Sequence, residues 1–159
     1  MKNLLKFALP VLCLSLMSCG GEEPKSNSST PPPKSMVQEK LAPASERITL
    51  DDKGVGEIKE VTLDPEINQD WVAEGADIFK TNCTACHKIE KRFIGPSPKG
   101  ILERRSPEWI MNMILDPQLM VEEDRCAMDL LVEFNGAAMA NQNLTVEQTR
   151  SILEYFRTL

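Results

Sequence analysis

Apolar residues recur at helical spacing in the second half of the chain. From Asp70 onward they appear every three or four positions, and the last of them, Phe79, precedes a cysteine by four residues. This spacing predicts a helix that ends close to that cysteine. A second helix is predicted after Ser106, because serine followed by proline is typical of a helix start, and Asp116-Pro117 is predicted to end it.

Two more helices are predicted towards the C-terminus. One spans Glu122 to Phe134 and stops before Asn135-Gly136, a pair that favours the end of a helix. The other opens at Thr145, where the order Thr-Val-Glu-Gln fits a capping box. Since no segment of this region is a secure strand, the predicted fold class is all-α, with about four helices.

The first 69 residues follow other patterns and divide into three parts. Residues 1–18 combine two lysines with an apolar run that is too short to span a membrane, as in a signal peptide. Residues 19–45 are rich in serine, asparagine and proline, which predicts a disordered linker. In residues 46–69 apolar and polar residues alternate weakly, and this pattern predicts an extended segment, or a short hairpin, that packs on the domain formed by residues 70–159.

The signal-like segment ends in Leu16-Met17-Ser18-Cys19, which resembles the lipobox of bacterial lipoproteins. In that family the signal is cleaved before the cysteine, and the cysteine then carries a lipid. The resemblance implies that Cys19 is lipidated and that the chain is anchored to a bacterial membrane in the cell envelope, facing the periplasm. A plain secretory signal cut near Ser18 is the alternative.

The charge of the chain argues against one class of function. With 18 basic and 24 acidic residues the formal net charge is −6, and no basic patch is interleaved with aromatic residues. Binding of nucleic acid therefore has no support.

The chemistry of the chain is concentrated in Cys83-Thr84-Ala85-Cys86-His87. Cys-x-x-Cys-His is the attachment signature of haem c. Two cysteines three residues apart at the end of a helix present both sulfurs to the two vinyl groups of one haem, and the adjacent histidine then faces the iron. The motif predicts one covalently bound haem c, with His87 as a ligand of the iron.

Two other uses of the cysteines have less support in the sequence. A thioredoxin-like dithiol would lie at a βαβ junction, whereas the pattern around Cys83 and Cys86 is helical. A zinc site needs four ligands, and only Cys126 and carboxylates remain to complete it. Cys126 itself is expected to be a small buried hydrophobe, with a redox or dimer-forming thiol as the minor alternative.

His87 is the only histidine of the chain, which restricts the sixth ligand of the iron. Ligation by two histidines, a second ordinary haem and a histidine-rich copper site are all excluded. Methionine, a weaker group or an open position remains. Met139 is the favoured candidate because it lies in a loop of small residues that would let the backbone approach a flat cofactor, and Met120 is its rival.

The other methionines after the motif are expected in the core, and two arginines are candidates to contact the cofactor. Met111, Met113 and Met128 lie in predicted helices and are expected to pack in the core. Arg104 and Arg105 are candidates to pair with the haem propionates, and at least one of them is expected to lie at the surface in contact with solvent.

From about Trp71 to Leu159 the chain resembles a class I cytochrome c. The residues that carry the resemblance are a Gly-x-x-x-Phe pair before the motif, an aromatic residue on the last helix and a Gly-Pro loop after the motif: Gly75, Phe79, Tyr155, Gly95 and Pro96. The resemblance implies a small fold around one haem, a hydrogen bond from His87 to the carbonyl of Pro96, and ligation by Met139. No proline precedes Met139, which departs from the usual family pattern.

The resemblance also implies a function. The domain is similar to short lipoprotein cytochromes of bacterial respiratory chains, some of which feed nitrous oxide reductase or terminal oxidases. The expected function is thus a membrane-tethered carrier of single electrons, not an enzyme, with donor and acceptor proteins left unidentified. The alternatives are a haem sensor or enzyme with an open sixth position, and a fixed electron-entry subunit of a larger complex. From the net charge, we expect a partner with an apolar patch or a basic rim.

Overall fold

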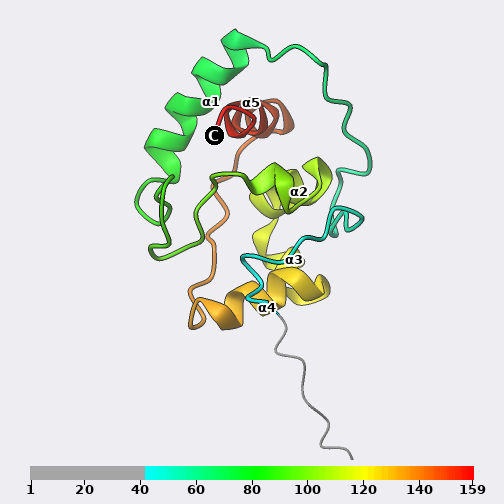
Figure 1. Ribbon diagram of the computed structural model, residues 1–159, viewed down its shortest axis with the longest axis vertical. Coiled ribbons are helices and arrows are strands. Elements are labelled where there is room, and N and C mark those ends of the chain that lie inside the picture. The colour runs from blue at the N-terminus through cyan, green and yellow to red at the C-terminus, as the bar shows by residue number, and fades with distance from the viewer. Residues whose placement is uncertain (1–41) are drawn as a thin grey trace, which may run out of the picture. The chain divides into compact units, whose positions relative to one another are not determined.

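The computed structural model describes residues 42–159, and within this range the protein is all-α, without a sheet. Five α-helices and one short 3₁₀ helix follow one another along the chain (Figure 1): α1 Gln69–Asn82, η1 Ile101–Glu103, α2 Pro107–Leu115, α3 Pro117–Glu123, α4 Arg125–Glu133 and α5 Val146–Phe156. The expected signal peptide, Cys19 and most of the expected linker lie outside the described residues.

The helix starts follow the capping residues of the sequence. The side chain of Ser106 accepts a hydrogen bond from the amide of Trp109 at the start of α2, with proline in the first turn. Thr145 and Gln148 form the expected capping box at the start of α5. These two predicted helix starts are confirmed.

The prediction of one helix from Glu122 to Phe134 is wrong, and the count of about four helices is therefore one too low for the described residues. Asp116 does end α2, but its carboxylate also caps a new helix by accepting from the amide of Leu119, and Pro117 occupies the first position of that helix. Asp124 then interrupts the chain with an extended backbone and caps α4. The cap at Asp124 thus divides what the apolar pattern alone reads as one helix, and the cap at Asp116 starts the additional helix before it.

Helices α1 and α5 pack with almost no space between their backbones. A side chain at Gly75 would collide with the backbone of Ser151, so glycine is required where the two helices cross. One turn further along α1, the ring of Phe79 lies 5.7 Å from the rings of both Tyr155 and Phe156. The crossing fixes the C-terminal end of α1, where the cysteine motif begins (Figure 1).

Residues 43–64 form an extended strap along α2, α3 and α4, here called the N-terminal strap. It contains no hairpin, and its one β-bridge joins Thr49 to Arg105. Its apolar side chains pack on the core, and its backbone donates hydrogen bonds to side chains of the helices. The amide of Ile58 donates to Asn112 (3.0 Å), and the amide of Val61 donates to Glu108 (3.1 Å). The N-terminal strap thus supplies hydrogen-bond partners for the buried polar side chains of α2.

The start of the N-terminal strap is held by carboxylates of α4. The amide and hydroxyl of Ser45 both donate to Glu133, and Arg47 pairs with Asp129 at 2.8 Å. Burial raises the pKa of Glu133, but the hydrogen bonds from Ser45 and the charge of Arg92 outweigh it and hold that pKa below its usual value. Both carboxylates thus remain charged acceptors at neutral pH.

Among residues 42–159 no helix combines the length and the apolar character needed to cross a membrane.

The crossing of α1 and α5 leads to a test. Helix propensity alone would make Gly75→Ala stabilising by about 1 kcal/mol. Because the new methyl group meets the backbone of Ser151, we expect the substitution instead to lower the free energy of unfolding by about 1–3 kcal/mol. Denaturant unfolding of the two proteins, with Ala73→Gly at an exposed position of α1 as the propensity control, measures the difference. A Gly75→Ala protein that is more stable than the parent would contradict the close crossing.

Candidate functional site

The Cys83–His87 motif forms one tight turn at the C-terminal end of α1. The amide of Cys83 still donates to the carbonyl of Phe79, as the last bond of the helix. The amides of Cys86 and His87 both donate back to the carbonyl of Cys83, at 3.0 and 2.9 Å. The two thiols and the imidazole therefore project from a single turn whose position is set by α1.

The ring of His87 is held by the loop that follows the motif. Its Nδ1 lies 2.8 Å from the carbonyl oxygen of Pro96. Because a carbonyl only accepts hydrogen bonds, Nδ1 carries the proton, and in the neutral ring the lone pair is then on Nε2. The amide of Gly95 donates to the carbonyl of Cys86 at 2.9 Å and ties the loop to the motif.

Gly95 is required by the position of this ring. A methyl group at Gly95 would lie 2.5 Å from Cε1 and 2.9 Å from Nδ1 of His87, well inside contact distance. The loop backbone thus packs directly on the imidazole, and only glycine allows that approach.

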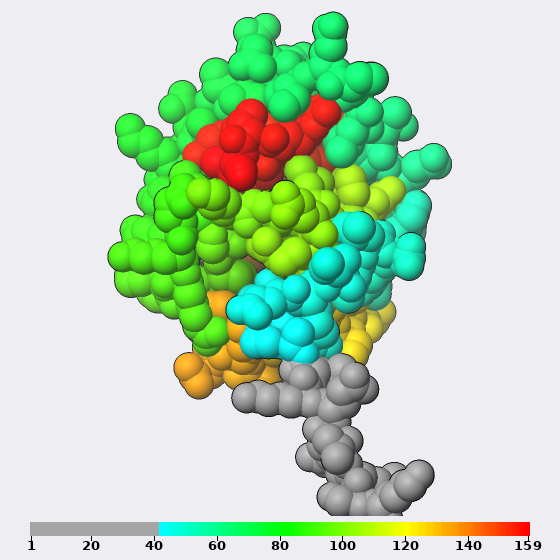
Figure 2. Space-filling model, in the orientation of Figure 1, coloured from blue at the N-terminus to red at the C-terminus, as the bar shows by residue number. Residues whose placement is uncertain are grey.

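A mainly apolar cavity lies between α1, α2, α4, α5 and the two loops that follow the motif and α4. On the face shown in Figure 2 a hollow opens where the green and orange parts of the surface meet. Five residues of the site predicted from the sequence line this cavity: Cys83, Cys86, His87, Pro96 and Met139. Large aromatic side chains complete the lining, among them Phe79, Trp109 and Phe134. The cavity thus gathers Cys83, Cys86, His87, Pro96 and Met139 from positions 56 residues apart in the chain.

The methionines separate into two groups. Met139 and Met113 line the cavity, and both are partly buried. Met120 does not line it: this side chain is fully buried, and its sulfur accepts a hydrogen bond from the amide of Val55 at 3.1 Å. Met113, which the sequence assigned to the core because of its helical position, is therefore a more relevant rival to Met139 than Met120 is.

Arg104 and Arg105 also line the cavity, in different ways. Arg104 is half-buried and donates to loop carbonyls. Arg105 is 3% exposed and donates to the carbonyls of Ala44 and Arg47 in the N-terminal strap, whereas its Nε is buried without a hydrogen-bond partner in the described protein. A buried donor of this kind requires an acceptor.

The thiols are arranged differently from those of a dithiol oxidoreductase. Burial, together with the neighbouring Cys86, raises the pKa of the Cys83 thiol to about 11. Reactive dithiols instead have lowered pKa values, often because they lie at the positive N-terminal end of a helix. Here the motif follows the C-terminal end of α1, which carries the opposite partial charge.

A zinc site also finds no support in the described residues. Nowhere in residues 42–159 do three or more histidine, cysteine or acidic side chains gather so that they would hold a metal ion. Cys126 is 3% exposed, and burial raises the pKa of its thiol. It belongs to the hydrophobic core cluster, as a small apolar residue would.

The donor set of the cavity fits a covalently held haem. The two thiols, an imidazole with Nε2 free, and a thioether lie around one apolar space. The unpartnered Nε of Arg105 matches the carboxylates that a haem carries on one edge.

The sequence missed Ser45, which lines the same cavity, and no pattern in a serine-rich segment could have indicated it.

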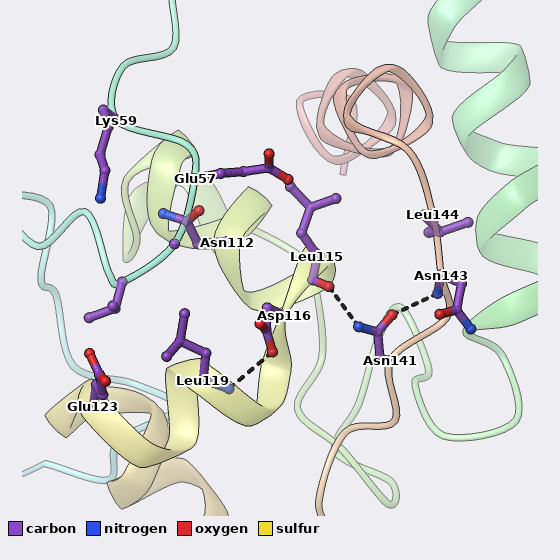
Figure 3. Close-up of a pocket in the computed structure, with 12 residues that line it drawn as sticks. Glu57, Lys59, Asn112, Leu115, Asp116, Leu119, Glu123, Asn141, Asn143 and Leu144 are labelled. Atoms are coloured by element: carbon purple, nitrogen blue, oxygen red, sulfur yellow. Dashed lines mark hydrogen bonds between the residues drawn. The ribbon is translucent and has the colours of Figure 1, made fainter.

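A second, more open cavity lies between the N-terminal strap, the start of α3 and the loop before α5 (Figure 3). The side-chain amide of Asn141 donates to the carbonyl of Leu115, and the carboxylate of Asp116 accepts from the backbone amide of Leu119, so these polar groups already have partners. Neither a thiol nor an imidazole lines this cavity. Its charged lining residues, Glu57, Lys59 and Glu123, include none of the groups that hold a haem.

Comparison with known proteins gives concordant results. The sequence model of the cytochrome c family matches residues 72–159. Cytochrome c from Rhodothermus marinus is similar in structure, with a TM-score of 0.63 and 35% identity over 73% of this chain and 92% of that chain. An engineered form of that cytochrome, bound to a carbene intermediate, has a TM-score of 0.61, again with 35% identity, over 73% of this chain and 93% of that one. No curated protein matches the chain.

The contact between Gly95 and His87 can be tested by substitution. In the haem-loaded chain, Gly95→Ala should displace the imidazole and lengthen its hydrogen bond to Pro96, which weakens the ligand field at the iron. We expect a shifted Soret band, a changed reduction potential and a loss of about 1–3 kcal/mol of stability. Gly136→Ala is the control for the spectra and the potential alone: no atom lies within 4 Å of a methyl group there, but the φ of 78° strains an alanine and lowers the stability by itself. Equal spectra for the parent and Gly95→Ala would refute this role of the loop.

Proposed function

The chain belongs to the cytochrome c family, and on that premise we propose that it is a membrane-tethered carrier of single electrons in a respiratory chain. Membership of the family implies a covalently bound haem c, and proteins of this family are typically electron carriers. The acceptor that we propose is a terminal reductase, such as nitrous oxide reductase, or a terminal oxidase.

The haem supplies an iron that gains and loses one electron. In this proposal Cys83 and Cys86 would hold the haem through thioether bonds, and His87 would coordinate the iron through Nε2. Pro96 keeps the proton of His87 on Nδ1, which orients the ring and raises the basicity of Nε2. These roles are supported by the hydrogen bond from His87 to Pro96 and by the position of both thiols at the cavity wall.

We further propose that Met139 is the second protein ligand of the iron. The observation that carries this proposal is that Met139 and His87 line the same apolar cavity, whereas Met120 lies elsewhere with its sulfur already engaged. Histidine and methionine together leave no position open for a substrate, and the thioether favours the reduced iron. A saturated iron suits electron transfer and disfavours the alternatives of a gas sensor or a haem enzyme.

Methionine-to-leucine variants of the haem-loaded chain test this assignment, because leucine keeps the volume and removes the sulfur. We expect Met139→Leu to lower the reduction potential by a large margin, to remove the far-red absorption of the sulfur-to-iron bond and to let carbon monoxide bind. Met113→Leu, at the same cavity, and Met120→Leu are the matched controls and should change none of these. Carbon monoxide binding to the unmodified chain would instead support the sensor or enzyme.

The tether of the proposed carrier rests on the sequence Leu16-Met17-Ser18-Cys19. Lipidation of Cys19 would leave the residues up to about 42 as a spacer between the membrane and the domain, with a composition rich in serine and proline that favours an extended chain. A carrier of single electrons on such a spacer can reach its donor and then its acceptor without leaving the membrane surface.

For the tether we expect Cys19→Ser to abolish lipidation and to move the haem-loaded protein from the membrane fraction to the soluble fraction, or to leave it uncleaved. Cys13→Ser, within the same signal-like segment, is the matched control and should leave the protein in the membrane. The measurement is fractionation followed by mass spectrometry of the N-terminus. An unmodified Cys19 in the mature parent protein would disprove the anchor.

A further inference from the structure

The most exposed large apolar side chains of residues 42–159 lie at one end of the domain. Val132, on α4, is 73% exposed, and Ile48, in the N-terminal strap, is 70% exposed. Leu50 and Met128, from the same two elements, are 50% and 42% exposed. Figure 1 shows the cyan start of the strap beside α4. We call these four side chains the strap–α4 surface.

The strap–α4 surface faces away from the core. Met128 and Val132 are four residues apart and share one face of α4, whereas another face of that helix lines the haem cavity. In the strap, Arg47 pairs with Asp129 of α4 at 2.8 Å, and the next side chain of the extended backbone, Ile48, points to solvent. The helical position of Met128 predicted packing in the core, and that prediction is wrong: none of the four side chains belongs to the core of the described residues.

The charge around the strap–α4 surface differs from that of the rest of the domain. Both carboxylates of α4 pair with arginines, Asp129 with Arg47 and Glu133 with Arg92. Residues 43–50, α4 and Arg92 together contain three basic and three acidic residues, a net charge of 0. The remaining residues of the described range contain ten basic and eighteen acidic residues, a net charge of −8. An anionic lipid surface therefore repels the domain as a whole, but not at the strap–α4 surface.

The chain enters the domain next to this surface. The described residues begin at Ala42, and Ser45 already donates two hydrogen bonds to Glu133 of α4. Cys19, the proposed lipid anchor, precedes Ala42 by 23 residues. A spacer of this length and composition has a root-mean-square reach of about 25–30 Å, which is less than the diameter of a domain of this size, roughly 35 Å. An anchored domain thus stays within one diameter of the bilayer, and the spacer joins it beside α4.

From these observations we propose that the strap–α4 surface docks on the phospholipid bilayer that carries the anchor, with its apolar side chains inserted between the headgroups. The proposal rests on the proposed tether at Cys19 and adds the surface with which the domain contacts the membrane. Four side chains of this size hold a free protein on a bilayer only weakly, but the spacer keeps the domain at a local concentration in the millimolar range. The contact is reversible, and while it lasts α4 lies between the bilayer and the haem cavity.

Photoactivated lipid labelling locates the contact without altering the protein. The lipidated, haem-loaded chain is reconstituted in vesicles of phosphatidylethanolamine and phosphatidylglycerol with a trace of a phospholipid that carries a diazirine on one acyl chain. Labelled peptides are identified by mass spectrometry after illumination. We expect the label to concentrate in residues 43–50 and 125–133 and to be several-fold lower in α1 and α5. Equal labelling of all helices, or a label concentrated elsewhere, would overturn the proposal.

Glutamine variants test the apolar contribution. Met128→Gln/Val132→Gln replaces two exposed side chains of α4 with a good helix former, so we expect the fold to be kept and the labelling of α4 to fall several-fold. Val146→Gln is the matched control: it removes an apolar side chain, 36% exposed, at the start of α5 and should leave the labelling of α4 unchanged. If the double variant is labelled as strongly as the parent, the apolar side chains do not dock.

The salt dependence of the labelling separates apolar insertion from attraction between charges. Because mobile ions screen charges and not apolar contacts, we expect the labelling of α4 to persist as the salt concentration rises. Labelling that disappears at high salt would assign the contact to arginines on anionic headgroups and would overturn insertion of the strap–α4 surface.

The tether and the surface fail separately. An unmodified Cys19 would refute the tether, but the mature chain coupled through that thiol to a maleimide lipid still tests the surface in the same vesicles, because docking requires only that the domain is held near a bilayer. Sedimentation in neutral detergent tests another occupant, and we expect a monomer. A dimer that Met128→Gln/Val132→Gln dissociates would assign the surface to a second copy of the chain and overturn docking on lipid.

Discussion

The backbone contact between α1 and α5 at Gly75 is the constraint on which the rest of the structure depends. With no side chain between them, the two helices hold each other at a fixed depth, and Phe79 then packs against Tyr155 and Phe156 one turn later. The motif follows Phe79 within a single turn of chain, so the positions of both thiols and of His87 derive from this crossing. The rigid helix pair thereby fixes the position of the motif turn, which would be mobile by itself.

A second close approach of glycine completes the arrangement. Gly95 packs on the ring of His87, and the carbonyl of the next residue, Pro96, accepts the hydrogen bond from its Nδ1–H. The loop thus fixes the imidazole through shape and through one hydrogen bond, and both come from adjacent positions of the chain. In both places the sequence uses the smallest residue where a backbone must touch a functional element.

The sequence predicted those parts of the molecule that depend on local chemistry. The all-α class, the caps at Ser106 and Thr145 and the family of the motif-bearing domain are confirmed. The division of the helix at Asp124 was missed because apolar spacing continues across it. Ser45 and the cavity-facing position of Met113 were missed for another reason: they depend on which elements pack together, and a single sequence carries no local signal for that.

The N-terminal strap gives the molecule two different boundaries. The family pattern begins at residue 72, yet Glu108 and Asn112 of α2 find their hydrogen-bond partners in residues 53–61. A shortened chain beginning at residue 70 would lose these hydrogen bonds, and it would also lose the apolar contacts that Val55, Ile58 and Val61 make with the core. The unit that is recognisable by ancestry is therefore smaller than the unit that folds. Any transfer of this domain to another protein, whether by recombination in evolution or by design, therefore has to include the N-terminal strap.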